Sequence, residues 1–91
     1  MNQIKNLIDL IGNTPIVQVK RLDVGKCNLF LKMENTNPGS SIKDRVALNI
    51  IENAEKKGLL NKDSVIVEAS AGNTALGLSL IARIKGYRSI V

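Results

Sequence analysis

The stretch Asn37-Pro38-Gly39-Ser40-Ser41-Ile42-Lys43-Asp44-Arg45 passes from a turn into a helix. Proline and glycine favour the turn, and Ser40 or Ser41 can cap the amino end of the helix. Apolar residues recur at helical spacing from residue 41 to residue 57, so we predict a helix there, ended by Gly58. Its buried stripe is predicted to contain Val46, Ala47, Ile50, Ile51 and Ala54.

Lys43 is placed at the start of that helix, where unpaired N–H groups create a partial positive charge. An ammonium group is disfavoured there, so its proton is easier to lose. A neutral lysine amine can attack an aldehyde and form a Schiff base. Gly39 would let the backbone approach a flat ligand closely. The alternative is an ordinary helix start, in which Asp44 complements the helix dipole.

A second change from strand to helix occurs at Ser70-Ala71-Gly72-Asn73-Thr74. We predict a strand at residues 65–67 and a helix from Asn73 or Thr74 to Lys85, with Gly86 as its stop. The N–H groups of Gly72, Asn73 and Thr74 would form a cradle for a carboxylate or phosphate, with side-chain donors from Ser70, Asn73 and Thr74. The alternative is a simple cap by Asn73 or Thr74.

This second helix is apolar almost all round, which predicts burial on most of its sides. The chain then turns toward a strand at residues 89–91, which completes a βαβ unit. A helix this apolar must be covered by more packing elements than these 91 residues supply. We therefore expect the chain to be a fragment of a longer α/β protein. A nucleotide-binding P-loop does not fit, because Leu78 stands where that motif requires lysine.

The sequence before the first long helix is predicted to contain a short helical segment or turn and two strands. The expected elements are a short helix or turn at 4–11, a turn at 12–15, strands at 16–19 and 28–33, and between them a loop at 23–26 around Gly25.

Composition narrows the class of protein. The chain has 13 basic and 8 acidic residues, a net charge of +5, and these charges are interleaved, as on a solvated surface. The shortage of aromatic residues and the lack of a basic stripe argue against nucleic-acid binding. No apolar run is long enough for a membrane span.

The sequence has no histidine and one cysteine, Cys27, which excludes the usual zinc sites, a Ser-His-Asp triad and an intramolecular disulfide. We expect no metal site. We interpret Cys27 as a small core residue and predict a reducing, cytoplasmic location.

Three motifs together resemble the pyridoxal-phosphate enzymes of the cysteine synthase and cystathionine β-synthase family. Residues 10–15 are similar to the family's N-terminal signature. Residues 32–34 and 37–45 are similar to its cofactor-lysine signature, and residues 68–74 to its substrate-carboxylate loop. The resemblance implies pyridoxal 5'-phosphate as the cofactor. It also implies an α/β fold of fold type II, tryptophan synthase beta-like, with an open sheet and flanking helices.

By position, the resemblance implies that Lys43 forms the Schiff base and moves the α-proton, and that Asn73 hydrogen-bonds the ring oxygen of the cofactor. The substrate α-carboxylate would be held by Ser70, Ala71, Gly72, Asn73 and Thr74. The implied reaction is β-replacement through an aminoacrylate intermediate. It would give cysteine from O-acetylserine and sulfide, or cystathionine from a serine-type substrate and homocysteine.

The carboxylate loop departs from the commonest family sequence, Pro-Thr-Ser-Gly-Asn-Thr-Gly. Ala69, Ser70, Ala71 and Ala75 stand here in place of Pro, Thr, Ser and the last Gly. Ser70 keeps a hydroxyl group, so the anion site survives. Cystathionine-synthase-like members resemble this alanine variant, which slightly favours the second reaction.

Family members are considerably longer, so the resemblance implies that residues 1–91 are a single N-terminal fragment. Strands within residues 13–35 would belong to the larger domain, and residues 36–91 would begin the smaller, substrate-binding domain. The cup for the cofactor phosphate would lie downstream. We therefore expect these residues alone to be inactive, and the full-length enzyme to be a homodimer. The alternative to an enzyme is a small, basic, non-catalytic α/β module that binds an anion or a partner protein.

Overall fold

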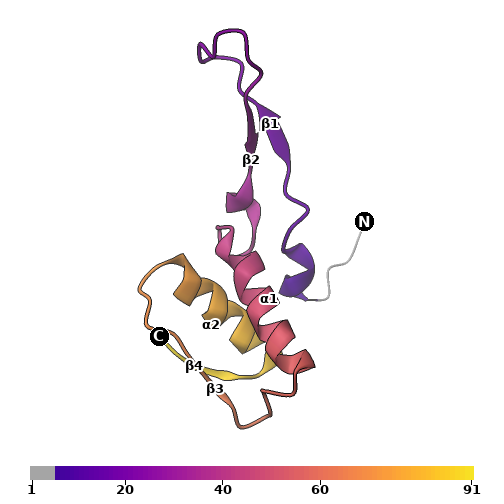
Figure 1. Cartoon of the computed structure of the whole chain (residues 1–91), viewed down its shortest axis with the longest axis vertical. Helices are drawn as coiled ribbons and strands as arrows, with labels where there is room; N and C mark the ends of the chain where they lie inside the picture. Colours follow the sequence, from indigo (N-terminus) through magenta and orange to yellow (C-terminus); the bar gives the residue numbers. More distant parts are fainter. Residues whose placement is uncertain (1–5) are drawn as a thin grey trace.

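The computed structural model describes residues 6–91, and Figure 1 shows a narrow hairpin projecting from a body of two helices and a small sheet. The order of elements is η1 (Leu7–Leu10), β1 (Ile16–Gln18), β2 (Phe30–Lys32), η2 (Glu34–Thr36), α1 (Lys43–Lys56), β3 (Val65–Val67), α2 (Asn73–Lys85) and β4 (Arg88–Ile90). The short elements η1 and η2 are 3-10 helices. The strands form two separate two-stranded sheets, one antiparallel and one parallel.

Strands β1 and β2 are the two predicted strands, each shorter than predicted, and the structure shows that they pair as an antiparallel hairpin. The pairing nevertheless continues past both strands, because Val19 N–H donates to the Leu29 carbonyl at 2.9 Å and Met33 N–H to the Pro15 carbonyl at 2.9 Å. The predicted turn before β1 is present, with positive φ at residues 12 and 13. Of the predicted helix or turn at 4–11, residues 4 and 5 lie outside the described residues.

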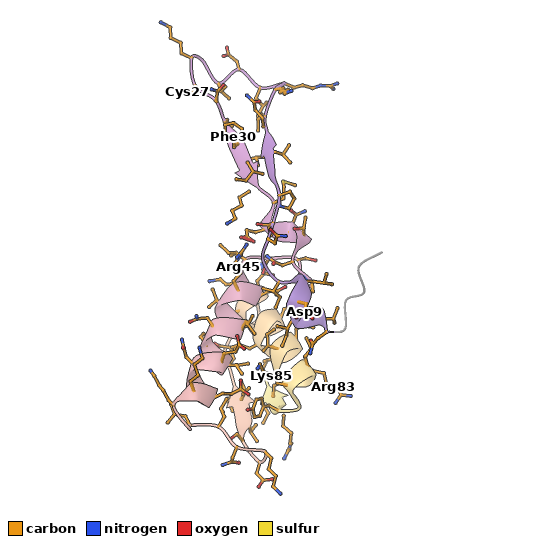
Figure 2. All side chains as sticks on the ribbon, turned by 90° about the vertical axis from the view of Figure 1, so that its right-hand side faces the viewer. Asp9, Cys27, Phe30, Arg45, Arg83 and Lys85 are labelled. Carbon is orange, nitrogen blue, oxygen red and sulfur yellow. The ribbon has the colours of Figure 1, made fainter. Side chains whose placement is uncertain are left out.

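Cys27 lies in the loop at the far end of the hairpin, and its side chain is exposed (Figure 2). Our interpretation of this cysteine as a core residue was therefore wrong. The alternation of apolar residues near Cys27 predicts a strand correctly, but it does not reveal that the hairpin extends away from the helices.

The core lies between α1 and α2, where Ala47 and Ile51 pack against Leu78 and Ile81. Only part of the predicted stripe on α1 is buried, since Val46 is 37% exposed and Ile50 is 49% exposed. The buried residues of α1 are Asp44, Ala47 and Ile51, which lie on one narrow line along the helix. The prediction was too broad because α2 covers only that line.

The predicted βαβ unit is confirmed, with β3 and β4 parallel and α2 between them in sequence. Gly86 ends α2 with φ of 85°, as predicted, and Tyr87 N–H donates to the Ala82 carbonyl at 2.8 Å. This closure is the usual left-handed helix end that glycine favours. The sharp end turns the chain back so that β4 contacts α2.

A polar cluster joins the carboxyl ends of the two helices to the start of β4. The Lys85 amine donates to Glu55 Oε1 at 2.8 Å, and the Tyr87 hydroxyl donates to Glu55 Oε2 at 2.8 Å. These hydrogen bonds lower the pKa of Glu55 and raise that of Lys85. These hydrogen bonds connect the carboxyl ends of α1 and α2. The amino ends of both helices lie together at the opposite end of the body (Figure 1).

Candidate functional site

Asn37 is a buried side chain that fixes the turn before Lys43. It is 2% exposed, and its Oδ1 accepts a hydrogen bond from Gly12 N–H at 2.8 Å. Its Nδ2 donates to the carbonyl of Glu34 at 2.9 Å and to that of Ser41 at 3.1 Å. One amide therefore ties the N-terminal turn at residue 12 to both ends of the segment that leads into α1.

Asp44 holds the same turn from inside the first turn of α1. It is fully buried, and its Oδ2 accepts a hydrogen bond from Gly39 N–H. Its Oδ1 has no hydrogen-bond partner within residues 6–91. A Cβ at Gly39 would overlap this carboxylate. On the side where a Cβ would stand, Gly39 is therefore covered by Asp44, and the close approach of a flat ligand to the rest of its backbone stays a prediction.

Helix α1 begins at Lys43, two residues later than predicted, and Ile42 occupies the cap position. Ser41 Oγ still accepts a hydrogen bond from Lys43 N–H at 3.1 Å. Ser40 does not cap the helix. Its φ is 68°, and its N–H donates to the Asn37 carbonyl at 2.7 Å. Such a φ is costly for serine, so the surrounding hydrogen bonds hold the turn in one conformation.

An ion pair between Glu34 and Arg45 braces the base of this turn. Arg45 Nε lies 2.7 Å from Glu34 Oε1, and Arg45 Nη2 donates to Thr14 Oγ1 at 3.2 Å. Burial acts to raise the pKa of the Glu34 carboxyl, but hydrogen bonds from Asn37 and Arg45 outweigh it, and the net pKa is lowered. This bracing was not predicted from the sequence, where the opposite charges of Glu34 and Arg45 on the two sides of one turn were the available signal.

Lys43 is half-buried, and its backbone lies directly against α2. A Cβ at Gly77 would come within 2.8 Å of the Lys43 carbonyl oxygen. Asn73 precedes Gly77 by one helical turn, about 6 Å along the axis. Both helices begin at the same end of the body, so the turn before Lys43 and the loop at residues 70–74, hereafter the two junctions, lie at that end together (Figure 1). This role of Gly77 was not predicted from the sequence.

The second junction borders a cavity of about 260 Å³. It is lined by Ser70, Ala71, Gly72, Ala75, Leu76, Ser79 and Val91. The loop follows β3 and Val91 follows β4, so the cavity lies at the carboxyl edge of the parallel strands. This edge is where open α/β sheets bind ligands.

No side chain caps α2, whose cap position is Gly72. The predicted alternative, a cap by Asn73 or Thr74, was therefore wrong, because Asn73 is already the first helical residue. Ser70 Oγ accepts a hydrogen bond from Gly72 N–H at 3.2 Å. The N–H groups of the first turn of α2 are the kind of donors that bind an anion.

The structure gathers half of the predicted site residues in one place. Ser70, Ala71 and Gly72 line the cavity. Asn73 and Thr74 begin α2 beside it without lining it, and Lys43 lies on the neighbouring helix. Across residues 6–91, no group of three or more His, Cys, Asp or Glu residues is placed to hold a metal ion. In that same part of the chain, every helix is too short or too polar to cross a membrane.

The fold and the two junctions together define a class of protein. Residues 7–91 match the family described as pyridoxal-phosphate dependent enzyme, and the chain belongs to this family. It is 52% identical over 87 residues to the cysteine synthase of Flavobacterium sp., a match that covers 96% of this chain and 28% of that protein. It is 46% identical over 90 residues to the cystathionine beta-synthase of Saccharomyces cerevisiae, covering 94% of this chain and 18% of that protein.

A solved structure confirms the fold prediction. The hydrogen sulfide-producing enzyme of Fusobacterium nucleatum superposes with a TM-score of 0.94 and 47% identity, covering 98% of this chain and 30% of that one. The structural relatives are pyridoxal-phosphate enzymes of fold type II, as predicted. The chain spans less than a third of the length of each of these relatives.

The described residues fit the cofactor of this family. Lys43 supplies a primary amine at a rigid helix start, and the uncapped start of α2 supplies backbone donors for an anionic group. The cavity beside α2 is slightly smaller than the roughly 300–1,000 Å³ of complete small-molecule sites.

Proposed function

We propose that this chain carries the lysine and the carboxylate-binding loop of an enzyme that performs β-replacement on a serine-type amino acid. The observation that supports this most is the contact between the first turn of α1 and α2 at Gly77. The first turn of α1, which bears Lys43, packs on α2 just below its uncapped start. A primary amine and an anion cradle therefore belong to one rigid unit.

Each residue has a part in this proposal. Lys43 would hold pyridoxal 5'-phosphate through its amine and, once the substrate amine has displaced it, would carry a proton to and from the α-carbon of the substrate. Asn73 donates to the ring oxygen of the cofactor, and residues 70–74 hold the α-carboxylate on backbone and hydroxyl donors. The cofactor, when bound, serves as the electron sink for the α-carbanion. Glu34, Asn37 and Asp44 keep the turn before the lysine fixed.

The full-length protein provides the test. We expect a visible absorbance band, and borohydride reduction followed by peptide mass spectrometry should place the pyridoxyl group on Lys43. Lys43→Ala should lose about 10²–10⁴-fold in kcat. Lys43→Arg is the matched control, because it keeps the charge and removes the reactive amine. A colourless, full-length protein that binds no cofactor would instead favour the small, basic anion- or partner-binding module.

Two substrate pairs fit the proposal, namely O-acetylserine with sulfide, and a serine-type substrate with homocysteine. The relatives bear names of both kinds, cysteine synthase and cystathionine beta-synthase. Product analysis with each pair distinguishes them, since cysteine forms from the first and cystathionine from the second. If neither product forms faster than it does with Lys43→Ala, β-replacement is contradicted.

We also propose that the full-length enzyme is a cytoplasmic homodimer with a larger domain that includes residues 13–35 and a smaller one that begins at residue 36. Residues 1–91 alone are expected to bind the cofactor weakly. Sedimentation of the full-length protein measures the assembly, and cell fractionation the location. Stoichiometric pyridoxyl label on the 91-residue chain, with normal activity, would contradict the need for further sequence.

A further inference from the structure

Gly77 lies in the middle of α2, and its position against Lys43 is the tightest backbone approach made by any glycine in the described residues. A Cβ built there would come within 2.8 Å of the Lys43 carbonyl oxygen, 3.1 Å of its carbonyl carbon and 3.3 Å of Ala47 Cβ. The other glycines would meet only side chains or nothing within 4 Å. Gly77 is thus the residue that lets α2 touch the main chain of the lysine.

The conformation of Gly77 does not itself require glycine. It is buried inside a regular helix, and its φ is not positive. Alanine is a better helix former than glycine, so helix propensity would favour a substitution. Within the described residues, glycine at this position is therefore explained by the space that the Lys43 carbonyl and, less closely, Ala47 Cβ occupy.

The Lys43 carbonyl cannot move aside alone, because in an α-helix it accepts the hydrogen bond from the amide four residues later. A side chain at residue 77 would have to push the whole first turn of α1 away from α2. Asn73 lies on the same face of α2, one turn toward its start. Displacing α2 at residue 77 therefore changes the distance from Lys43 to Asn73 and to the loop at residues 70–72.

We propose that Gly77 is a positioning residue that sets the spacing between the Lys43 amine and the loop that holds the substrate carboxylate. This inference rests on the proposed function, in which those two groups act on one substrate. The cofactor attaches to α1 and the carboxylate is held at the start of α2, so the α-carbon lies between two helices. Their separation at Gly77 then decides how well the amine reaches the α-proton.

The size of the effect follows from the contact. Reaching an ordinary C···O separation would part the helices by about 0.5 Å. A misplacement of about 1 Å in an active site can reduce the rate about 10²-fold, so we expect kcat to fall about tenfold in Gly77→Ala. Attachment of the cofactor should persist, because the Lys43 amine is unchanged.

The experiment uses the full-length holoenzyme and three variants. Gly77→Ala should keep the cofactor absorbance and stoichiometry and lose about tenfold in kcat. Gly77→Ala/Ala47→Gly removes the contact with Ala47 Cβ and leaves the contact with the Lys43 carbonyl, so kcat should stay low. Ile81→Val is the matched control, because it weakens the same helix interface away from Lys43 and should lower Tm without changing kcat.

The outcomes separate the two proposals. A wild-type enzyme without cofactor or activity would overturn the proposed function, and this inference with it. An active wild type with normal kcat in Gly77→Ala would overturn only the inference. If Gly77→Ala fails to fold, the double variant is measured in its place, and wild-type kcat there would also overturn it. So would an equal loss of kcat in Ile81→Val, since interface stability alone would then explain the effect.

Discussion

Asp44 shows how one residue can determine the geometry of its neighbour. Its carboxylate is fully buried beside Gly39, and a Cβ at residue 39 would overlap it. We therefore predict that Gly39→Ala lowers the free energy of unfolding by about 1–3 kcal/mol, the usual cost of overpacking. Chemical denaturation of the full-length protein measures this change.

Gly72→Ala is the matched control for that prediction. A Cβ at Gly72 would have no atom within 4 Å, and the φ of −105° suits alanine. Its effect on stability should stay within about 0.5 kcal/mol. If Gly39→Ala lowers the free energy of unfolding no more than Gly72→Ala does, the Asp44 carboxylate moves aside easily, contrary to the tight packing around it.

Glu34 should make stability depend on acidic pH. Its pKa is lowered in the folded protein because hydrogen bonds from Asn37 and Arg45 outweigh the effect of burial. A group with a lowered pKa adds stability above its unfolded pKa, and this contribution is lost as pH falls through the folded pKa. Wild-type protein should therefore lose stability below the ordinary value of 4.5.

Glu34→Gln should have a flatter stability profile in that acidic range and a lower stability at neutral pH. Denaturation midpoints measured from pH 3 to pH 7 test this, where about pH 4 is the usual region of glutamate titration. Parallel profiles for the two proteins would mean that the ion pair with Arg45 contributes nothing to folding.

At the scale of the element, α1 offers a test between adjacent residues. Ile51 is 2% exposed and Ile50 is 49% exposed. Ile51→Ala should cost about 2–5 kcal/mol, since it leaves a cavity in the core. Ile50→Ala should cost much less. Thermal denaturation of the two variants compares them, and equal losses in the full-length protein would reveal that further sequence covers Ile50.

The ends of the helices were predictable from the sequence, whereas the start of α1 was not. Gly58 and Gly86 follow the helices with φ of 69° and 85°, a conformation that glycine adopts at little cost. Ser40 and Ser41 were equally good caps by residue type. Their actual roles depend on Asn37 and Asp44, which contact them through the folded turn.

In the candidate site, too, some features were predictable from the sequence and others were not. Ser70, Ala71 and Gly72 are consecutive, so any turn at that point brings them together, as predicted. Their relation to Lys43 depends on two helices meeting at Gly77, a contact between distant parts of the sequence. Hydrophobic periodicity predicts that a helix is buried, but it does not identify the helix that covers it. The buried Asp44 was missed for the same reason.

The whole molecule is more extended than its length requires. Its radius of gyration is 16.5 Å, whereas a compact chain of this length would have about 12 Å. The β1–β2 hairpin accounts for the difference (Figure 1). Neighbouring residues that point to opposite faces are both exposed, such as Ile16 at 64% and Val17 at 48%. Strands that are apolar on both faces are typically covered on both.

We predict that the 91-residue chain expressed alone self-associates through this hairpin. Exposed apolar strands with free edges pair readily with one another. Sedimentation velocity at increasing concentration measures the association. Val17→Lys/Phe30→Lys should reduce it, because charge on an exposed strand opposes pairing. Leu59→Lys is the matched control, as Leu59 is 70% exposed but lies outside the hairpin. An equal reduction in that control would implicate total charge instead.

The position of the hairpin near the amino end has a consequence during synthesis. Ribosomes release residues 16–32 before residue 90, and at about 5–20 residues per second the delay is roughly 3–12 s. Phe30 and Leu31 are exposed even in the folded 91-residue structure, so we expect both to stay exposed throughout that interval. We expect a nascent-chain chaperone to engage there and to leave once later sequence arrives. Crosslinking on stalled ribosomes, with and without Phe30→Lys, would detect that engagement.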